Sequence, residues 1–227
     1  MRRRFGMTMA LLLAVAGSGV GVAPAGETEW TLKRALKQMD RATKQREAIS
    51  GNIEYEELYR SRTVSGSGQI HVRFDGKVRA EIGGSSPRTF LLKPPYMQIY
   101  RPVDESVEIL TMGVNPDMLA QYALLGFVPA GSEMKRAYNL TLLEQTVEEG
   151  RELLVFNLEP KDKRARQIVT KIRLMIDTAN WLPAGQLLYH KPSGIQVTVR
   201  YSDLAEADLP TTMFKSDWPE GTRVIRR

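Results

Sequence analysis

Apolar and polar residues alternate through residues 66–110, and the rest of the chain is organised around this stretch. Two arms, residues 69–74 and 77–82, carry apolar residues at every second position. This period is typical of strands with one buried face and one solvated face. Asp75 and Gly76 between the arms predict a two-residue hairpin turn, because such turns need positive φ angles. The pattern therefore predicts an antiparallel hairpin with one apolar face.

Further strands follow the same alternation in both halves of the chain. Residues 53–59 are expected to form a strand at the edge of the meander. The other predicted strands cover residues 88–93, 96–100, 103–110, 138–147, 152–159, 168–176, 184–190 and 195–201. A sheet of about ten antiparallel strands has to curl. The predicted fold class is α+β, with a single large curved antiparallel sheet that forms an open half-barrel.

An amphipathic helix is predicted near the start of the chain, over residues 31–48. Its apolar stripe includes Leu32, Leu36 and Met39, and lysine and arginine crowd the opposite face. Gly51 is expected to end it. Such a helix needs an apolar sheet face to cover, so we expect it to lie on the concave side of the half-barrel.

Two short helices are predicted between the two groups of strands. Asn115, Pro116 and Asp117 have the composition of a helix start, and the following residues to 125 are apolar around most of the circumference. A second short helix is predicted over residues 132–137. Both inserted helices are expected to cover the concave apolar face.

The first 25 residues have the layout of a secretory signal peptide. Three arginines precede a short apolar run, and residues 23–25 offer an Ala-x-Ala cleavage site. A retained membrane anchor is the alternative, but glycines interrupt the run, which is short for a span. We expect cleavage after Ala25, a single domain over residues 26–227, and a location in the periplasm.

Charge and cysteine content narrow the possible partners. The chain has no cysteine, so it can form neither a disulfide nor a lipidated N-terminal cysteine. Its formal charge of +6 falls to +3 without residues 1–25, which hold three arginines and no acid. The remaining charge is spread along strands, so nucleic acid is not expected as a partner.

The residue inventory gives little support to catalysis. His71 and His190 are the only histidines, and both are expected to face solvent. With no cysteine, two histidines are too few for the usual metal sites, and no metal or other cofactor is expected. Glu56 and Glu57 are adjacent on a strand, so they point to opposite faces. A carboxylate pair assembled from distant strands stays open, which leaves an enzyme as the least favoured class.

A surplus of apolar residues is the remaining functional signal. Leucine and methionine on a short helix usually pack as ordinary core, and that interpretation stays open. The other interpretation is a lid over an apolar cavity, where flexible methionines suit ligands of variable shape. The predicted cavity wall consists of Phe74, Val78, Ile82, Phe90, Leu92, Met97 and Ile99. The predicted lid consists of Met118, Leu119, Tyr122 and Leu125.

The order of elements resembles the LolA-like superfamily, which includes periplasmic carriers and sorting proteins of outer-membrane lipoproteins. The C-terminal residues Phe214, Pro219, Gly221 and Val224 are similar to the ending of that family. Where the family has a turn arginine, this chain has Phe74. It therefore looks like a divergent member.

The resemblance implies a carrier that takes the acyl chain of a lipoprotein, or another lipid, from an inner-membrane transporter. It would pass this cargo to an outer-membrane acceptor, acting as a monomer through transient contacts with membrane proteins. Two alternatives stay open. One is a signalling or scaffold module of the same fold that binds a membrane-anchored protein partner. The other is a carrier of a non-lipoprotein hydrophobic cargo that works with an export pump.

Overall fold

The computed structural model describes residues 29–111, 127, 131–190 and 194–227. The strands are β1 (Ala48–Leu58), β2 (Thr63–Arg73), β3 (Lys77–Ile82), β4 (Arg88–Lys93), β5 (Tyr96–Arg101), β6 (Ser106–Thr111), β7 (Tyr138–Glu148), β8 (Arg151–Pro160), β9 (Val169–Asp177), β10 (Pro183–His190), β11 (Gln196–Glu206) and β12 (Arg223–Arg226). The helical elements are α1 (Leu32–Lys44), α3 (Gly131–Ala137), α4 (Ala165–Ile168) and the 3-10 helix η2 (Thr211–Phe214).

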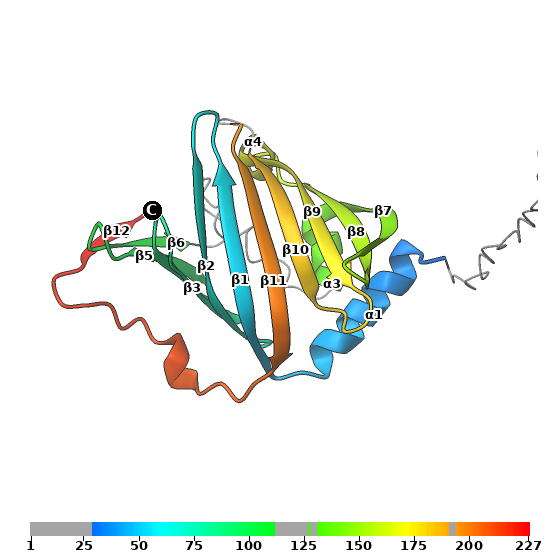
Figure 1. Cartoon of the computed structure of the whole chain (residues 1–227), viewed down its shortest axis with the longest axis horizontal. Coiled ribbons are helices and arrows are strands. Elements are labelled where there is room, and N and C mark those ends of the chain that lie inside the picture. Colours follow the sequence, from blue (N-terminus) through cyan, green and yellow to red (C-terminus); the bar gives the residue numbers. More distant parts are fainter. Residues whose placement is uncertain (1–28, 112–126, 128–130, 191–193) are drawn as a thin grey trace, which may run out of the picture.

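All twelve strands belong to one sheet, in the order β12-β6-β5-β4-β3-β2-β1-β11-β10-β9-β8-β7 (Figure 1). Every neighbouring pair is antiparallel except β12 and β6, which are parallel. The sheet is open, because β7 and β12 form its two edges and do not pair with each other. The predicted α+β fold with one large curved antiparallel sheet is confirmed.

The main core lies on the concave face of this sheet. One continuous cluster of buried apolar residues reaches from Val78 and Met97 on the β3–β5 side to Phe156 and Leu174 on β8 and β9. Leu36 and Met39 of α1, together with Met134 of α3, belong to the same cluster. The helices therefore cover the concave face, as their apolar stripe predicts.

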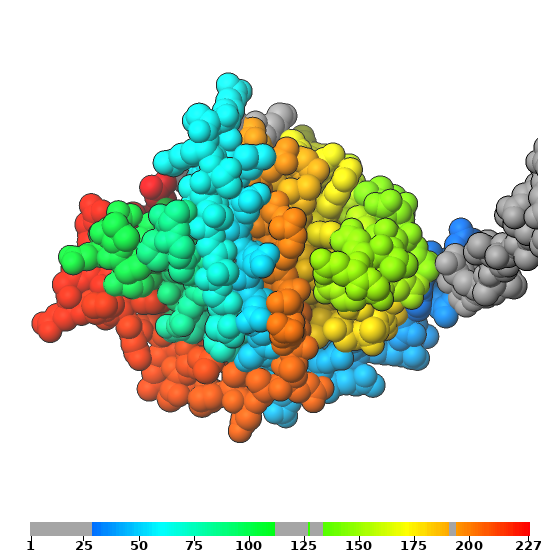
Figure 2. All heavy atoms as spheres, viewed as in Figure 1, coloured from blue at the N-terminus to red at the C-terminus, as the bar shows by residue number. Residues whose placement is uncertain are grey.

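A smaller core lies on the convex face beneath residues 207–222, which we call the C-terminal strap. Phe214 of the strap is buried with Leu91 of β4. Trp218 stacks on Tyr100 at 5.0 Å between ring centroids, and its indole N–H donates to the Gln98 amide oxygen at 2.7 Å. The strap then leads into β12, which completes the edge of the sheet beside β6. Figure 2 shows it along the lower and left margins of the convex face.

The predicted place of β1 at the edge of the meander is confirmed, because β1 follows β2 at the end of the series β6-β5-β4-β3-β2-β1. What the sequence did not predict is its second neighbour, β11, which puts β1 in the middle of the whole sheet. Ile53 faces Gly68 of β2 on one side and Tyr201 of β11 on the other. The pairing with β11 joins the two halves of the chain. Alternation within a strand shows which face is buried, but it does not show which strands are neighbours.

The turn between β2 and β3 also differs, because it has three residues and not two. Arg73 faces Lys77, which leaves Phe74, Asp75 and Gly76 as the loop. Gly76 has φ 97°, and its N–H donates to the Arg73 carbonyl at 3.0 Å. A left-handed glycine commonly closes a three-residue hairpin loop. The extra loop residue takes Phe74 out of the strand alternation.

The first helix is shorter than predicted. Thr31 caps α1 by accepting a hydrogen bond from the Arg34 N–H at 3.3 Å, and the helix ends at Lys44. Gly51, predicted to end it, lies inside β1 beside a β-bulge. A Cβ on Gly51 would stand 2.7 Å from the Ser202 carbonyl oxygen, so this glycine allows two strands to approach closely.

β12 was not among the predicted strands, and the described residues form a sheet of twelve strands where about ten were expected. The short helix predicted over residues 132–137 corresponds to α3. The predicted signal peptide and the predicted lid residues Met118, Leu119, Tyr122 and Leu125 lie outside the described residues. In the part of the chain that the structure describes, no helix is both long enough and apolar enough to cross a membrane.

Candidate ligand-binding face

Six of the seven predicted wall residues lie together on the concave face. Strand register places Val78, Leu92 and Met97 in one row across β3, β4 and β5. Phe90 and Ile99 form the next row, and Ile82 follows on β3. All six are at most 5% exposed and belong to the concave cluster. The alternation of three short strands thus builds one continuous apolar wall.

The seventh residue, Phe74, lies at the end of this wall. It is half-buried and packs against the concave cluster from the loop between β2 and β3. The neighbouring Arg73 points to the convex side, where its guanidinium donates to the Leu209 carbonyl of the strap at 3.0 Å. Phe74 is therefore a rim residue of the apolar face.

The apolar face extends well beyond the predicted wall. Leu154 and Phe156 of β8, Ile172 of β9 and Val199 of β11 belong to the same cluster, with α1 packed over it. None of these residues was predicted to belong to the site, although residues 168–176 carry the clearest alternation in the chain. Phe127, which is 4% exposed, packs edge-on against the Tyr201 ring at 4.7 Å between centroids.

A charged cluster interrupts one end of the concave face. The Glu57 carboxylate accepts hydrogen bonds from the Tyr55 hydroxyl at 2.6 Å, the Tyr59 hydroxyl at 2.9 Å and the Arg88 guanidinium at 3.0 Å. Glu57 and Arg88 have side chains about one-tenth exposed. Burial, followed by the nearby Glu57 carboxylate, raises the pKa of Tyr55 well above its usual value.

The other hydrogen bonds of Arg88 stay within its own loop. Its guanidinium donates to the carbonyl and the hydroxyl oxygen of Ser86, at 3.1 and 3.0 Å. Glu56, by contrast, is exposed on the convex face, so the predicted opposite orientation of Glu56 and Glu57 is confirmed. The Glu57–Arg88 pair was not predicted from the sequence, although a glutamate at a buried position of a strand indicates a buried partner.

A second polar contact lies near the middle of the face. The Gln186 side-chain amide donates to the Tyr201 hydroxyl at 3.2 Å, and both residues are buried. Burial raises the pKa of Tyr201 well above its usual value, so this hydroxyl stays neutral at physiological pH. The concave face thus combines a large apolar area with neutral or internally paired polar groups, which is chemistry suited to a hydrophobic ligand.

The described residues contain no group of three or more histidine, aspartate or glutamate side chains placed to hold a metal ion. His71 lies on the polar face of β2, as predicted, but it is half-buried and not fully exposed. Its Nδ1 is 2.8 Å from the Ser50 hydroxyl oxygen. Burial lowers the pKa of His71 below its usual value.

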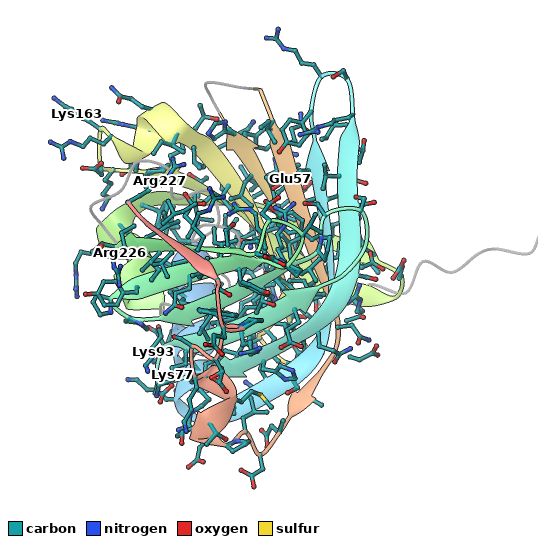
Figure 3. The ribbon with its side chains drawn as sticks, turned by 90° about the vertical axis from the view of Figure 1, so that its left-hand side faces the viewer. Glu57, Lys77, Lys93, Lys163, Arg226 and Arg227 are labelled. Atoms are coloured by element: carbon teal, nitrogen blue, oxygen red, sulfur yellow. The ribbon has the colours of Figure 1, made fainter. Side chains whose placement is uncertain are left out.

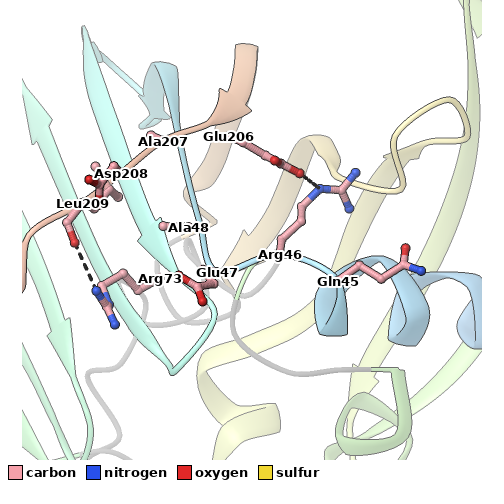
Figure 4. Close-up of a pocket in the computed structure, with 9 residues that line it drawn as sticks. All are labelled: Gln45, Arg46, Glu47, Ala48, Arg73, Glu206, Ala207, Asp208 and Leu209. Atoms are coloured by element: carbon pink, nitrogen blue, oxygen red, sulfur yellow. Dashed lines mark hydrogen bonds and ion pairs between the residues drawn. The ribbon is translucent and has the colours of Figure 1, made fainter.

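A polar cleft of about 460 Å³ lies at the end of the sheet where α1 leads into β1 and β11 leads into the strap (Figure 4). Arg46 lies 3.8 Å from the Glu206 carboxylate across it. Arg73 and Asp208 also line it. Its charged lining differs from the apolar concave face, so the two places would suit different ligands.

No family model and no curated protein matches this chain. Solved structures do match it. An uncharacterized conserved protein from Thermus thermophilus has a TM-score of 0.55 and 8% identity, over 87% of this chain and 100% of that one. A LolA superfamily protein from Nitrosomonas europaea has a TM-score of 0.45 and 15% identity, over 84% and 100%. The chain resembles LolA superfamily proteins in fold.

Another similar structure is MucB from Pseudomonas aeruginosa in its complex with MucA, with a TM-score of 0.43 and 17% identity over 82% of this chain and 61% of that one. The LolA superfamily, which the order of elements resembles, is thus among the similar structures, and this likeness concerns the fold alone. At these identities the likeness concerns the backbone architecture, and the ligand has to be argued from this chain's own residues.

Proposed function

We propose that this protein is a periplasmic carrier that holds an acyl chain of a lipoprotein, or of another lipid, against its concave face. The observation that carries the proposal is the apolar cluster that runs without a break across an open, unclosed sheet. An open sheet can change its separation from the covering helices without breaking strand pairing. An acyl chain can then replace helix side chains as the partner of the wall.

The energy available from such burial is large enough for a carrier. Each methylene removed from water contributes about 0.8 kcal/mol. Burial of about ten methylenes would contribute about 8 kcal/mol, which corresponds to a dissociation constant of about 1 μM before the ordering cost of the chain. We propose that an inner-membrane transporter loads the cargo and that an outer-membrane acceptor receives it. Met118, Leu119, Tyr122 and Leu125 would form the lid.

Leu92 and Leu91 offer a matched pair of variants for testing this function. They are neighbours on β4, and both are buried, Leu92 on the concave wall and Leu91 beneath the strap. Leu→Ala at either position removes the same atoms and is expected to cost about 2–5 kcal/mol of stability. Only Leu92→Ala removes a proposed contact with the ligand.

The measurement is the affinity of the purified protein for a fluorescent C16 fatty acid, at a temperature below the melting temperature of both variants. We expect Leu92→Ala to weaken binding about tenfold, which corresponds to the loss of about two methylene contacts. Leu91→Ala should bind as the wild type does. Equal affinities for all three proteins would remove the concave wall from the proposal. Failure of the wild type to bind any acyl probe would favour a module that binds a protein partner.

A further inference from the structure

The exposed face of α1 carries a charge pattern that the carrier function does not explain. Lys33, Lys37, Arg41 and Lys44 are exposed, while the buried stripe of the helix packs on the sheet. The first turn of α1 contains no acidic residue. A cation in the first turn lies near the positive end of the helix dipole and destabilises a helix. Lys33 therefore slightly disfavours the helix, and the fold does not account for its charge.

The basic residues continue from α1 onto two adjoining segments. α1 packs against α3, whose last turn holds Lys135 and Arg136. The Lys161 ammonium donates to the Lys135 carbonyl at 2.6 Å, and the Lys161 N–H donates to the Ala137 carbonyl at 2.9 Å. These contacts bring the loop that begins at Lys161 against α3.

We define the basic surface as the exposed cations of these three segments. Its eleven members are Lys33, Arg34, Lys37, Arg41, Lys44, Lys135, Arg136, Lys161, Lys163, Arg164 and Arg166. The same segments contain only three acids, Asp40, Glu133 and Asp162. The excess of cations over acids in these segments is larger than the formal net charge of +6 for the whole chain. The positive charge of this protein is therefore gathered here.

Within the described residues, none of these eleven cations forms an ion pair. Cations elsewhere commonly have a carboxylate partner, as Arg79 has Glu81 at 2.6 Å and Arg101 has Glu108 at 3.1 Å. Arg34 has a different contact, with its guanidinium 4.3 Å from the Trp30 ring centroid. Although the Lys161 ammonium donates to the Lys135 carbonyl, exposed cations without a carboxylate partner remain available to an external anionic surface.

The basic surface lies on the side of the molecule that carries the helices, opposite the convex sheet. In Figure 3 the labelled Lys163 is at the left-hand margin, while β1 and β2 are at the right. Arg226 and Lys93 are labelled toward the same margin. α1 and α3 pack on the concave face, so the basic surface lies on the concave side of the sheet.

We propose that the basic surface docks this protein onto an anionic phospholipid bilayer, with its helix side toward the headgroups. This inference rests on the proposed function, because a carrier has to bring its concave side to a membrane to exchange an acyl chain. A row of cations on a rigid helical layer matches the spread of phosphate charge on a bilayer. The apolar face of α1 remains in the core, so docking is electrostatic and involves no insertion of the helix.

A charge-reversal variant of α1 can distinguish an effect on membrane docking from an effect on folding. In Lys33→Glu/Lys37→Glu, the new glutamate at position 33 favours the helix dipole, and the one at 37 lies one turn before Arg41. The control is Arg173→Glu/Arg200→Glu, two exposed cations of β9 and β11 with the same change of net charge. Both lie on the convex face, because their neighbours Leu174 and Val199 belong to the concave cluster.

The assay is co-sedimentation of the purified protein with vesicles of phosphatidylcholine alone or with about one-third phosphatidylglycerol. Each cation near an anionic surface contributes about fivefold to partitioning. We expect wild-type binding only to the anionic vesicles and its loss at about 0.5 M salt. The α1 variant should bind at least about 30-fold more weakly without a lower melting temperature, and the control should change less than about threefold.

Three outcomes would overturn the proposal. They are equal binding to neutral and anionic vesicles, an equal loss in both variants, and binding to poly-glutamate but not to vesicles, which would indicate an acidic protein partner. The fatty-acid probe assay without vesicles distinguishes this failure from failure of the carrier function. Acyl binding without vesicle binding would leave the carrier standing and remove the docking surface. Vesicle binding without acyl binding would support the docking surface and remove the carrier function.

Discussion

The ion pair between Glu57 and Arg88 predicts a specific pattern of stability in a double-mutant cycle. Arg88→Met would leave the Glu57 carboxylate, which is about one-tenth exposed, with only its two tyrosine donors. Removal of one partner of a buried pair typically costs about 3–5 kcal/mol, and we expect about 3 kcal/mol here because some solvent reaches the pair. Glu57→Gln should cost about 2 kcal/mol, because it leaves the Arg88 charge without a carboxylate.

The double variant Glu57→Gln/Arg88→Met should be much less destabilised than the two single variants predict together. It removes both charges, and the glutamine oxygen can still accept from the Tyr55 and Tyr59 hydroxyls. We expect a cost of about 1 kcal/mol and therefore a coupling energy of about 4 kcal/mol. The assay is urea unfolding followed by tryptophan fluorescence, with the slope of the transition checked for two-state behaviour.

Two results would contradict this expectation. Single variants that each cost less than about 1 kcal/mol would show that solvent screens the pair as it screens surface ion pairs. Additive costs would show that the two side chains do not act together. The double variant should also bind the fatty-acid probe within about twofold of the wild type, because we assign the pair to the stability of the face.

Three further predictions concern the C-terminal strap, His71 of β2 and the proposed lid. Trp218→Ala should cost about 1–3 kcal/mol through the lost stacking on Tyr100 and the lost hydrogen bond, with faster hydrogen exchange in β12 and unchanged acyl binding. Because folding lowers the pKa of His71, the free energy of unfolding should fall as the pH falls below about 6.5. The variant His71→Asn should lose this part of the pH dependence. A pKa of His71 above about 6.5, measured by NMR in the folded protein, would contradict the prediction. Leu119→Asp should abolish acyl uptake while far-ultraviolet circular dichroism stays unchanged, and undiminished uptake would remove the lid.

The sequence predicted the strands well because alternation is a local signal. In β9, Ile172, Leu174 and Ile176 fall on the buried face as their spacing indicates. The wall residues on β3, β4 and β5 lie together for the same reason, since their short connections leave few alternatives to antiparallel pairing.

The remaining features depend on contacts between distant parts of the chain. The pairing of β1 with β11 joins residues about 150 positions apart, such as Asn52 and Ser202, and no local pattern encodes it. The Glu57–Arg88 pair likewise needs β1 and the β3–β4 loop to meet. The strap crosses the convex face through scattered anchors such as Phe214 and Trp218, which have no periodicity to reveal them.

The most direct test of the proposed carrier function is native mass spectrometry of the protein purified gently from its own cells. We expect a population with an added mass that collisional activation releases as an acylated molecule, and less of it in Leu92→Ala than in Leu91→Ala. A spectrum that contains only the polypeptide mass for the wild type, under conditions that preserve a known lipid-binding protein with its lipid, would contradict it.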